Sequence, residues 1–156
     1  MDHENTNWGQ SVTGVVINEG KVLLGRHTYG GGKGMLIVPG GYVEHGETPQ
    51  HALIREYLEE TGITIEPECI IGIRFNMHDW YVAFRAKYVS GTPKSDNDEN
   101  SEVLWVDVNE ALVREDVPEL TKKLIQSAIS DDAGLLYTDY ESTSHPPFSL
   151  YCIYTQ

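Results

Sequence analysis

Three glutamates stand close together in this chain, at Glu56, Glu59 and Glu60. If the segment is helical, spacings of three and four residues place the three side chains on one face, one turn apart. Carboxylates at such short range repel one another and raise the pKa of at least one of them. A hard cation such as Mg²⁺, with Mn²⁺ as a substitute, relieves this repulsion and shares its coordination shell with substrate phosphates. The glutamates therefore predict a metal site that faces a phosphorylated substrate.

The helix that carries these glutamates is expected to run from Pro49 to Thr61. Before it, Thr48 has a hydroxyl that can cap free backbone N–H groups, and the ring of Pro49 presets the first helical φ angle. After it, Gly62 supplies the left-handed conformation with which many helices end. The segment is long enough for about three and a half turns.

The longer segment from Gly41 to Ile63 resembles the Nudix box. The matching positions are Gly41, Glu47, Arg55, Glu56, Glu59, Glu60, Gly62 and Ile63, at the spacing of that motif. In this family a strand ending in Pro-Gly-Gly leads into the box, and residues 35–41 (MLIVPGG) fit that pattern. The chain departs from the family at two positions, because Tyr57 replaces an aliphatic residue and Leu36 stands where an aromatic residue is common. A match at so many fixed positions is a far stronger signal than a lone glycine motif.

The resemblance implies a role for each charged residue of the box. Glu56, Glu59 and Glu60 would bind Mg²⁺, and Glu47 would be an additional or water-mediated ligand. Arg55 would hydrogen-bond a neighbouring glutamate and fix its orientation. The alternative for Arg55 is a surface ion pair with Glu59, worth only about 0.3–0.5 kcal/mol.

The two glycines before the box allow two interpretations. By resemblance, Gly40 and Gly41 let the backbone approach a metal ion or a phosphate, with the Gly40 carbonyl as a metal ligand and Gly41 beside the substrate. Alternatively, they form a turn.

The reaction that the resemblance implies is attack by water on a phosphorus of a nucleoside diphosphate linked to another group. Mg²⁺ would neutralise the developing charge and acidify a bound water. Some members of the family use a general base in the loop before a later strand. Glu99 lies in such a loop, six residues before Trp105, and Glu102 is its rival. Both could instead belong to a solvated acidic loop.

Substrate identity depends on residues outside the box. Arg26, at the end of the second expected strand, is a candidate for a phosphate contact, and Tyr81, like Trp80 and Phe75, could stack on a base. The alternative for each is a place in the core or on the surface. Two substrate classes stay open by resemblance, namely nucleoside triphosphates, including oxidised ones, and ADP-ribose or nucleotide sugars.

Two other functions occur on similar folds. A non-catalytic nucleotide-binding sensor would usually carry a DNA-binding region and would have lost glutamates of the box, which this chain keeps. An isomerase of allylic diphosphates would need a catalytic cysteine and clustered histidines, and Cys69 has no such cluster near it in the sequence. The hydrolase is therefore the preferred function, and the sensor is the alternative.

Length and charge limit the remaining possibilities. The 156 residues suit a single domain over 1–156, with a flexible N-terminus at 1–10. A net charge of −13 argues against a nucleic-acid partner, although a metal ion can bridge the protein to a small nucleotide. We find no signal peptide pattern and no apolar run of about 18 residues, so we expect no membrane span and a cytoplasmic location. Cys69 and Cys152 are expected to be reduced, and a homodimer is a further expectation from the resemblance.

Apolar patterning predicts an α+β fold. The expected elements are hairpins at 11–25 and 69–89, a glycine-rich loop at 28–34, a strand at 103–106 and helices at 49–61, 109–113 and 118–130. By resemblance they form a mixed sheet between helices, similar to an α/β/α sandwich. In the C-terminal extension, residues 135–156, two apolar runs at 135–140 and 148–154 predict the strands of an extra hairpin. That hairpin could be an edge of the sheet, a dimer contact or a substrate lid.

Overall fold

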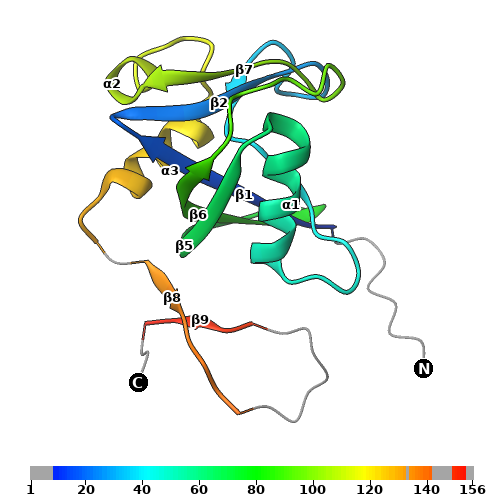
Figure 1. Ribbon diagram of the computed structural model, residues 1–156, viewed down its shortest axis with the longest axis vertical. Coiled ribbons are helices and arrows are strands. Elements are labelled where there is room, and N and C mark those ends of the chain that lie inside the picture. Colours follow the sequence, from blue (N-terminus) through cyan, green and yellow to red (C-terminus); the bar gives the residue numbers. More distant parts are fainter. Residues whose placement is uncertain (1–8, 133, 142–148, 154–156) are drawn as a thin grey trace.

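The computed structural model describes residues 9–132, 134–141 and 149–153, which form three helices and a layer of strands (Figure 1). In chain order the elements are β1 (Gly9–Asn18), β2 (Lys21–His27), β3 (Leu36–Ile37), β4 (Gly40–Tyr42), α1 (Pro49–Thr61), β5 (Thr64–Phe75), β6 (Asp79–Ser90), β7 (Asn100–Asp107), α2 (Val108–Ala111), α3 (Glu119–Ile129), β8 (Leu135–Tyr137) and β9 (Tyr151–Cys152).

The strands of the described residues form one mixed sheet. Its order is β3-β2-β1-β6-β5-β8-β9, with β4 paired to β1 and β7 paired to β2. Strand β1 is central, because it runs antiparallel to β2 and β4 and parallel to β6. This mixed sheet confirms the predicted α+β class.

The two longer helices cover opposite faces of the sheet (Figure 1). Successive side chains of a strand point to opposite faces. In β1, Val12 therefore joins a buried apolar cluster with Leu53 of α1, whereas Val15 joins a second cluster with Leu124 of α3. The sheet thus lies between helices, as expected, and the first of these clusters holds α1 against it.

Both predicted hairpins are confirmed. At the first turn, Glu19 and Gly20 have φ angles of 52° and 76°, and two left-handed residues in succession match the twist of a tight hairpin. At the second turn, the side chain of Asn76 accepts hydrogen bonds from the N–H groups of His78 and Asp79, each at 2.7 Å. Strands β5 and β6 then pair along their length.

The box helix α1 has the predicted bounds. It ends at Gly62, whose φ angle is 74° and whose N–H donates to the Leu58 carbonyl at 3.0 Å. The predicted N-terminal cap is wrong, because the Thr48 hydroxyl is buried and has no partner among the described residues. The helix start depends instead on Pro49 and on the Thr48 carbonyl, which accepts from the Ala52 N–H at 2.9 Å.

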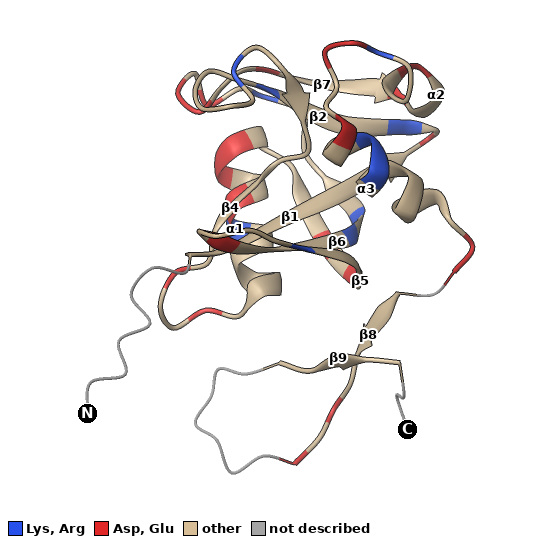
Figure 2. Cartoon of the chain, turned by 180° about the vertical axis from the view of Figure 1, so that it is seen from behind, with Lys and Arg blue, Asp and Glu red and all other residues tan. Residues whose placement is uncertain are grey.

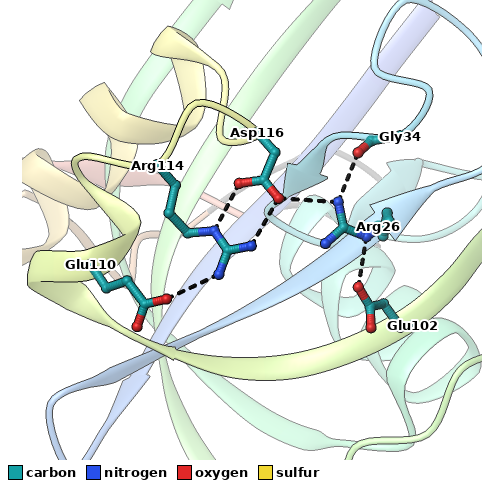
Figure 3. A network of polar contacts seen from close by, with 6 residues as sticks. All are labelled: Arg26, Gly34, Glu102, Glu110, Arg114 and Asp116. Atoms are coloured by element: carbon teal, nitrogen blue, oxygen red, sulfur yellow. Dashed lines mark hydrogen bonds and ion pairs between the residues drawn. The ribbon is translucent and has the colours of Figure 1, made fainter.

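The segment between α2 and α3 is fixed to β2 and β3 by Asp116. Its carboxylate accepts two hydrogen bonds from Arg114, at 2.7 and 2.9 Å, and one from Arg26 at 3.2 Å (Figure 3). Its carbonyl accepts from the Leu36 N–H at 2.8 Å.

None of the helices in the described ranges is long and apolar enough to cross a membrane.

The C-terminal extension adds a short hairpin at the edge of the sheet. Strand β8 pairs with Cys69 and Ile70 of β5, and β9 pairs with β8. Tyr151 of β9 packs edge-on against Phe84 with ring centroids 5.4 Å apart. The extra hairpin is thus confirmed in its paired strands. Residues 142–148 of the expected hairpin, its expected strand end Tyr154 and residues 1–8 lie outside the described residues.

Candidate functional site

Three carboxylates meet where the C-terminal half of α1 faces the start of β7. Oxygens of Glu56, Glu60 and Glu99 all lie within 4.8 Å of one another. Two of these side chains project from α1, whose C-terminal half is coloured as acidic in Figure 2, and Glu99 directly precedes β7. Glu60 is only 7% exposed. The structure therefore brings together two box glutamates and the candidate base as one acid cluster, which we define as Glu56, Glu60 and Glu99.

Glu59 lies outside the acid cluster. Its side chain is 59% exposed and accepts a hydrogen bond from Arg55 at 3.3 Å. Along a helix, residues i+3 and i+4 lie roughly 60° to one side and roughly 40° to the other side of residue i. Glu60 therefore turns toward Glu99, whereas Glu59 turns toward Arg55. The expectation that all three box glutamates converge is correct for Glu56 and Glu60 and wrong for Glu59.

Burial and crowding change the acidity of the acid cluster. Burial, together with a hydrogen bond to Glu99 and its negative charge, raises the pKa of Glu60 far above its usual range. A hydrogen bond from the backbone of Gly40 opposes this shift. Burial also raises the pKa of Glu56, and the hydrogen bond from Arg55 opposes that shift. Burial and mutual repulsion therefore favour the protonated form of these carboxyl groups in the metal-free protein.

Arg55 organises the outer side of the acid cluster. Its Nε and Nη2 atoms donate to the Glu47 carboxylate at 3.1 and 2.6 Å, and Nη1 donates to Glu56 at 2.8 Å. Nη2 also donates to the Tyr42 carbonyl at 3.0 Å. The hydrogen bonds to Glu47 and then to Glu56 raise the pKa of Arg55. Arg55 thus makes the orienting contact with Glu56, and the pair with Glu59 is only one of its several contacts.

Glu47 faces Arg55 and not the acid cluster. Both of its carboxylate oxygens accept from Arg55, and one of them also accepts from the Glu44 N–H at 2.9 Å. The hydrogen bonds from Arg55 lower the pKa of Glu47. Glu47, which was expected to be an additional metal ligand, therefore holds Arg55 in place through two hydrogen bonds. Arg55 in turn binds Glu56.

The two glycines before the box are required by protein contacts. They belong to strand β4, so their interpretation as a turn is wrong. A Cβ atom on Gly41 would lie 2.4 Å from the carboxyl carbon of Glu56, and one on Gly40 would lie 2.1 Å from the Val12 carbonyl oxygen. Both glycines therefore allow close approach to another protein group, and the predicted approach to a metal ion or a phosphate stays a prediction. At Gly41 it allows the Glu56 carboxylate to lie against the backbone.

Arg26 and Glu102 bind each other. The Nε of Arg26 donates to Glu102 at 2.6 Å, and its Nη1 donates to Asp116 and to the Gly34 carbonyl (Figure 3). The neighbour of Arg26, His27, lines a small hollow together with members of the acid cluster. Arg26 itself is held by Glu102 and Asp116 and is not among the residues that line that hollow. Of the two candidate bases, only Glu99 lies in the cluster.

Tyr81 lies mainly in the core. It packs against the buried apolar cluster that includes Leu124 of α3. The guanidinium of Arg74 lies 4.8 Å from the centre of its ring. Burial raises the pKa of Tyr81. The two other candidates for base stacking, Phe75 and Trp80, are exposed and contact each other edge-on with ring centroids 5.1 Å apart. The structure does not place these three rings in the acid cluster.

Two residues that support the site were not identified from the sequence. Tyr57, the departure from the box pattern, is fully buried, and its hydroxyl donates to the Gly14 carbonyl. Asn100 is 4% exposed, and its amide donates to the Glu60 carbonyl at 3.0 Å. The sequence offered one signal for Asn100, because it is a polar residue that directly follows Glu99 at the start of a strand.

The donor set fits the expected Mg²⁺. Three carboxylates within one short radius form the all-oxygen environment that this ion prefers. Beside them, the Oδ1 atom of Asn100 is buried without a partner among the described residues, and Asn100 lines the small hollow next to Glu60 and Glu99. A buried acceptor without a partner is an unsatisfied polar group, and here it lies directly beside the acid cluster.

Comparison with known proteins gives a family match. The profile of the NUDIX domain matches residues 8–127. The chain is 34% identical over 123 residues to the NAD-capped RNA hydrolase NudC of Vibrio atlanticus, covering 74% of this chain and 44% of that protein. It is 36% identical over 63 residues to the ADP-ribose pyrophosphatase of Methanocaldococcus jannaschii, covering 40% and 37%. It is 34% identical over 102 residues to the oxidized purine nucleoside triphosphate hydrolase of Danio rerio, covering 61% and 64%. The chain therefore spans less than half the length of the first two relatives.

The fold has counterparts among solved structures. The MutT NUDIX hydrolase of Burkholderia pseudomallei superposes with a TM-score of 0.69 at 20% sequence identity, covering 77% of this chain and 97% of that chain. At this level of identity the likeness concerns the fold, and it confirms the mixed sheet between helices that the resemblance implied.

Proposed function

The chain belongs to the NUDIX family, since the family profile covers residues 8–127, and we propose that it is a Mg²⁺-dependent hydrolase of nucleoside diphosphate derivatives. The reaction is cleavage of a pyrophosphate bond by water. The observation that carries this proposal is the acid cluster, whose oxygens lie within 4.8 Å of one another although Glu60 is buried. Without a cation such a cluster is unfavourable, and a divalent ion bound to phosphate relieves it.

Each residue of the site has a separate role in this mechanism. Glu56 and Glu60 would hold the ion from α1, and the exposed Glu59 and the Gly40 carbonyl would be further ligands. Mg²⁺, when bound, supplies charge neutralisation at the phosphate and a more acidic water. Arg55 keeps Glu56 in position through its hydrogen bond at 2.8 Å.

Glu99 is the proposed general base. It is less buried than Glu60, and it lies on the segment between β6 and β7 and not on the helix. Its carboxylate would accept the proton that the attacking water loses as the bond to phosphorus forms. Gly41 lies beside the substrate phosphates in this arrangement, because its backbone packs directly on Glu56.

The substrate classes are those that the relatives' names suggest. One relative is named for ADP-ribose, another for oxidised purine nucleoside triphosphates and a third for NAD-capped RNA. All of these contain a nucleoside attached to a chain of at least two phosphates. We propose a small molecule of this class, and the net charge of −13 favours it over an RNA chain because like charges repel.

Several broader expectations belong to the same proposal. They are a single domain over 1–156, Mn²⁺ as a substitute for Mg²⁺, a cytoplasmic location and assembly into a homodimer. In this assignment Arg26 and Tyr81 support the fold, since the first is bound by two carboxylates and the second is packed in the core. Sedimentation of the purified chain would test the dimer.

The test is hydrolysis of a panel of nucleotides in the presence of Mg²⁺, with products separated by chromatography. The panel contains nucleoside triphosphates, oxidised nucleotides, ADP-ribose, nucleotide sugars, NAD and dinucleoside polyphosphates. We expect release of a nucleoside monophosphate from at least one member, and loss of this activity by at least about 100-fold in Glu60→Gln. Glu66→Gln, which changes an exposed glutamate of β5, is the matched control.

Two results would contradict the proposal. Full activity of Glu60→Gln would remove the acid cluster from the mechanism. Intact substrates throughout, together with Mg²⁺-dependent binding of one of them, would favour the alternative, a non-catalytic nucleotide sensor.

A further inference from the structure

The loop that carries the candidate base is hydrogen-bonded to the C-terminal end of α1. This base loop, residues 94–99, leads into β7, which begins at Asn100. The last turn of a helix leaves carbonyl groups that have no partner inside the helix. Here the Thr61 carbonyl accepts from the Lys94 N–H at 2.8 Å, and the Glu60 carbonyl accepts from the Nδ2 atom of Asn100 at 3.0 Å. The base loop and the start of β7 therefore supply donors that the end of α1 lacks.

Asn100 connects the two sides of the acid cluster. It directly follows Glu99 in the chain, and its side chain binds the backbone of Glu60 on α1. This hydrogen bond is buried, since Asn100 is only 4% exposed. Loss of the bond would therefore change how Glu99 lies relative to Glu60, while both carboxylates stay in the chain.

Thr28, which follows β2, fixes the base loop from the other side. Its N–H donates to the Glu99 carbonyl at 3.1 Å, and its hydroxyl donates to the Asp98 carbonyl at 2.6 Å. The backbone at Glu99 is thus held between the end of β2 and the end of α1.

The base loop is also held by hydrogen bonds of its own. The Asp96 carboxylate accepts from the N–H groups of Asp98 and Asn100, at 3.0 and 3.1 Å. The Ser95 hydroxyl donates to the Asn100 carbonyl at 2.9 Å. Side chains thus bind backbone groups that a strand or a helix would pair in its own ladder. Glu99 therefore extends from a backbone that is fixed on several sides.

We propose that Asn100 and Thr28 are positioning residues for Glu99, because they hold the base loop against the Glu60 end of α1 and thereby set the geometry of the acid cluster. The inference rests on the proposed function and adds the residues that place its base. Both side chains bind backbone carbonyls, so their effect on the carboxylates is indirect. A small displacement of a catalytic group is enough to lower turnover strongly.

Stability alone does not explain the side chain of Asn100. Its Nδ2 atom makes a buried hydrogen bond, but its Oδ1 atom is buried without a partner in the described part of the chain. An unsatisfied buried acceptor costs about as much stability as one hydrogen bond contributes. The net contribution of this amide to stability is therefore small, and we expect Asn100→Ala to fold.

A double-mutant cycle tests whether Asn100 acts through Glu99. The four proteins are the wild type, Asn100→Ala, Glu99→Gln and the double variant, and the two readouts are Mn²⁺ affinity by calorimetry and turnover of a nucleotide. In the wild type, Asn100→Ala should lower both by about ten-fold, as is typical when an outer partner of a metal site is removed. In Glu99→Gln the same change should have an effect of less than about two-fold, because the carboxylate that Asn100 positions is already lost.

Thr28 provides a second cycle with the same two readouts. Thr28→Val keeps the shape of the side chain and removes the hydroxyl, so it should lower both quantities by about five-fold in the wild type and by less than about two-fold in Glu99→Gln. Thr28→Ser, which keeps the hydroxyl, should retain the wild-type values. Melting curves check the fold, and if Asn100→Ala does not fold, the Thr28 variants decide the question.

Asn76→Ala is the matched control. It also removes an asparagine that binds backbone groups, but in the turn between β5 and β6. Its Mn²⁺ affinity should stay within about two-fold of the wild type. Equal losses in the wild-type and Glu99→Gln backgrounds would overturn the proposal, since the residues would then act independently of Glu99. Wild-type affinity and turnover in both Asn100→Ala and Thr28→Val would overturn it as well.

The outcomes for the positioning role and for the proposed function are separate. Hydrolysis of the nucleotide panel with equal losses in the two backgrounds would leave the hydrolase intact and remove the positioning role. A dependence of the Mn²⁺ affinity on Asn100 that disappears in Glu99→Gln, without hydrolysis of any nucleotide, would keep the positioning role and remove the hydrolase.

Discussion

Replacement of Glu60 by Gln should stabilise the protein when no metal is present. In the folded chain, Glu60 is buried beside Glu99 and Glu56, and its pKa is raised far above its usual range. A Gln side chain has the shape of the protonated carboxylic acid. Its amide group can donate to Glu99 and its oxygen can accept from the Gly40 N–H. The variant therefore keeps the contacts of the protonated form and removes the charge.

The magnitude of this effect depends on pH. In the unfolded chain Glu60 ionises near pH 4.3, so above that pH folding of the wild type takes up a proton. The free energy of unfolding of the metal-free wild type should therefore fall as pH rises from about 5 to about 8, by at most about 1.4 kcal/mol per pH unit for this one group. Because the cluster shares its protons, we expect a total of about 1–3 kcal/mol over that range. Glu60→Gln should remove most of this slope.

Melting curves in EDTA and in Mg²⁺, at pH 6 and pH 8, measure these quantities. One kcal/mol corresponds to about 2–4 °C in melting temperature for a domain of this size. In EDTA at pH 8 the variant should melt several degrees above the wild type, by roughly 2–10 °C. Addition of Mg²⁺ should stabilise the wild type and have little effect on the variant, since binding to the folded state alone raises stability.

Glu66→Gln provides the matched control, because Glu66 is an exposed glutamate outside the acid cluster. It should follow the wild type within about 0.5 kcal/mol in every condition. A metal-free Glu60→Gln variant that melts below the wild type at pH 8, or that retains the pH slope of the wild type, would refute the reasoning. The carboxylate would then be ionised and favourably paired in the folded chain.

Three further predictions concern residues that hold the site. Gly41→Ala should destabilise the protein by about 1–3 kcal/mol and lower turnover at least ten-fold, because the new methyl group overlaps the Glu56 carboxylate. A variant with the melting temperature and turnover of the wild type would contradict this packing. Arg55→Lys should lower turnover by about ten-fold with little change in substrate affinity, because Lys cannot make the paired hydrogen bonds of a guanidinium. A steady-state assay that finds only a weaker substrate affinity would argue against the orienting role of Arg55. Tyr57→Phe should cost about 1–3 kcal/mol in chemical denaturation, because the Gly14 carbonyl loses a buried donor. A neutral Tyr57→Phe variant would mean that water replaces the hydroxyl.

The sequence predicted the elements whose causes are local. The bounds of α1 depend on Pro49 and Gly62, which act through their own backbone angles, and the structure has the same bounds. The tight turn at Glu19 and Gly20 likewise depends on two adjacent residues. The family resemblance rested on spacing along one helix and its flanks, and the match over residues 8–127 confirmed it.

The sequence could not predict contacts that depend on neighbouring strands. Glu99 was preferred to its rival Glu102 only by analogy, until the pairing of β2 with β7 set Arg26 opposite Glu102. The separate directions of Glu59 and Glu60 likewise depend on which side of α1 faces β7. The cap expected of Thr48 failed because its hydroxyl is buried and makes no hydrogen bond with the backbone. In each case the deciding partner is distant in sequence or set by packing.

The central claim is that Glu56 and Glu60 hold the divalent ion beside Glu99, and anomalous diffraction from crystals soaked in Mn²⁺ tests it most directly. We expect a peak within about 2.5 Å of carboxylate oxygens from this cluster. A peak only at the exposed carboxylates of the surface, or none at the acid cluster while the protein binds Mn²⁺ in solution, would contradict the claim.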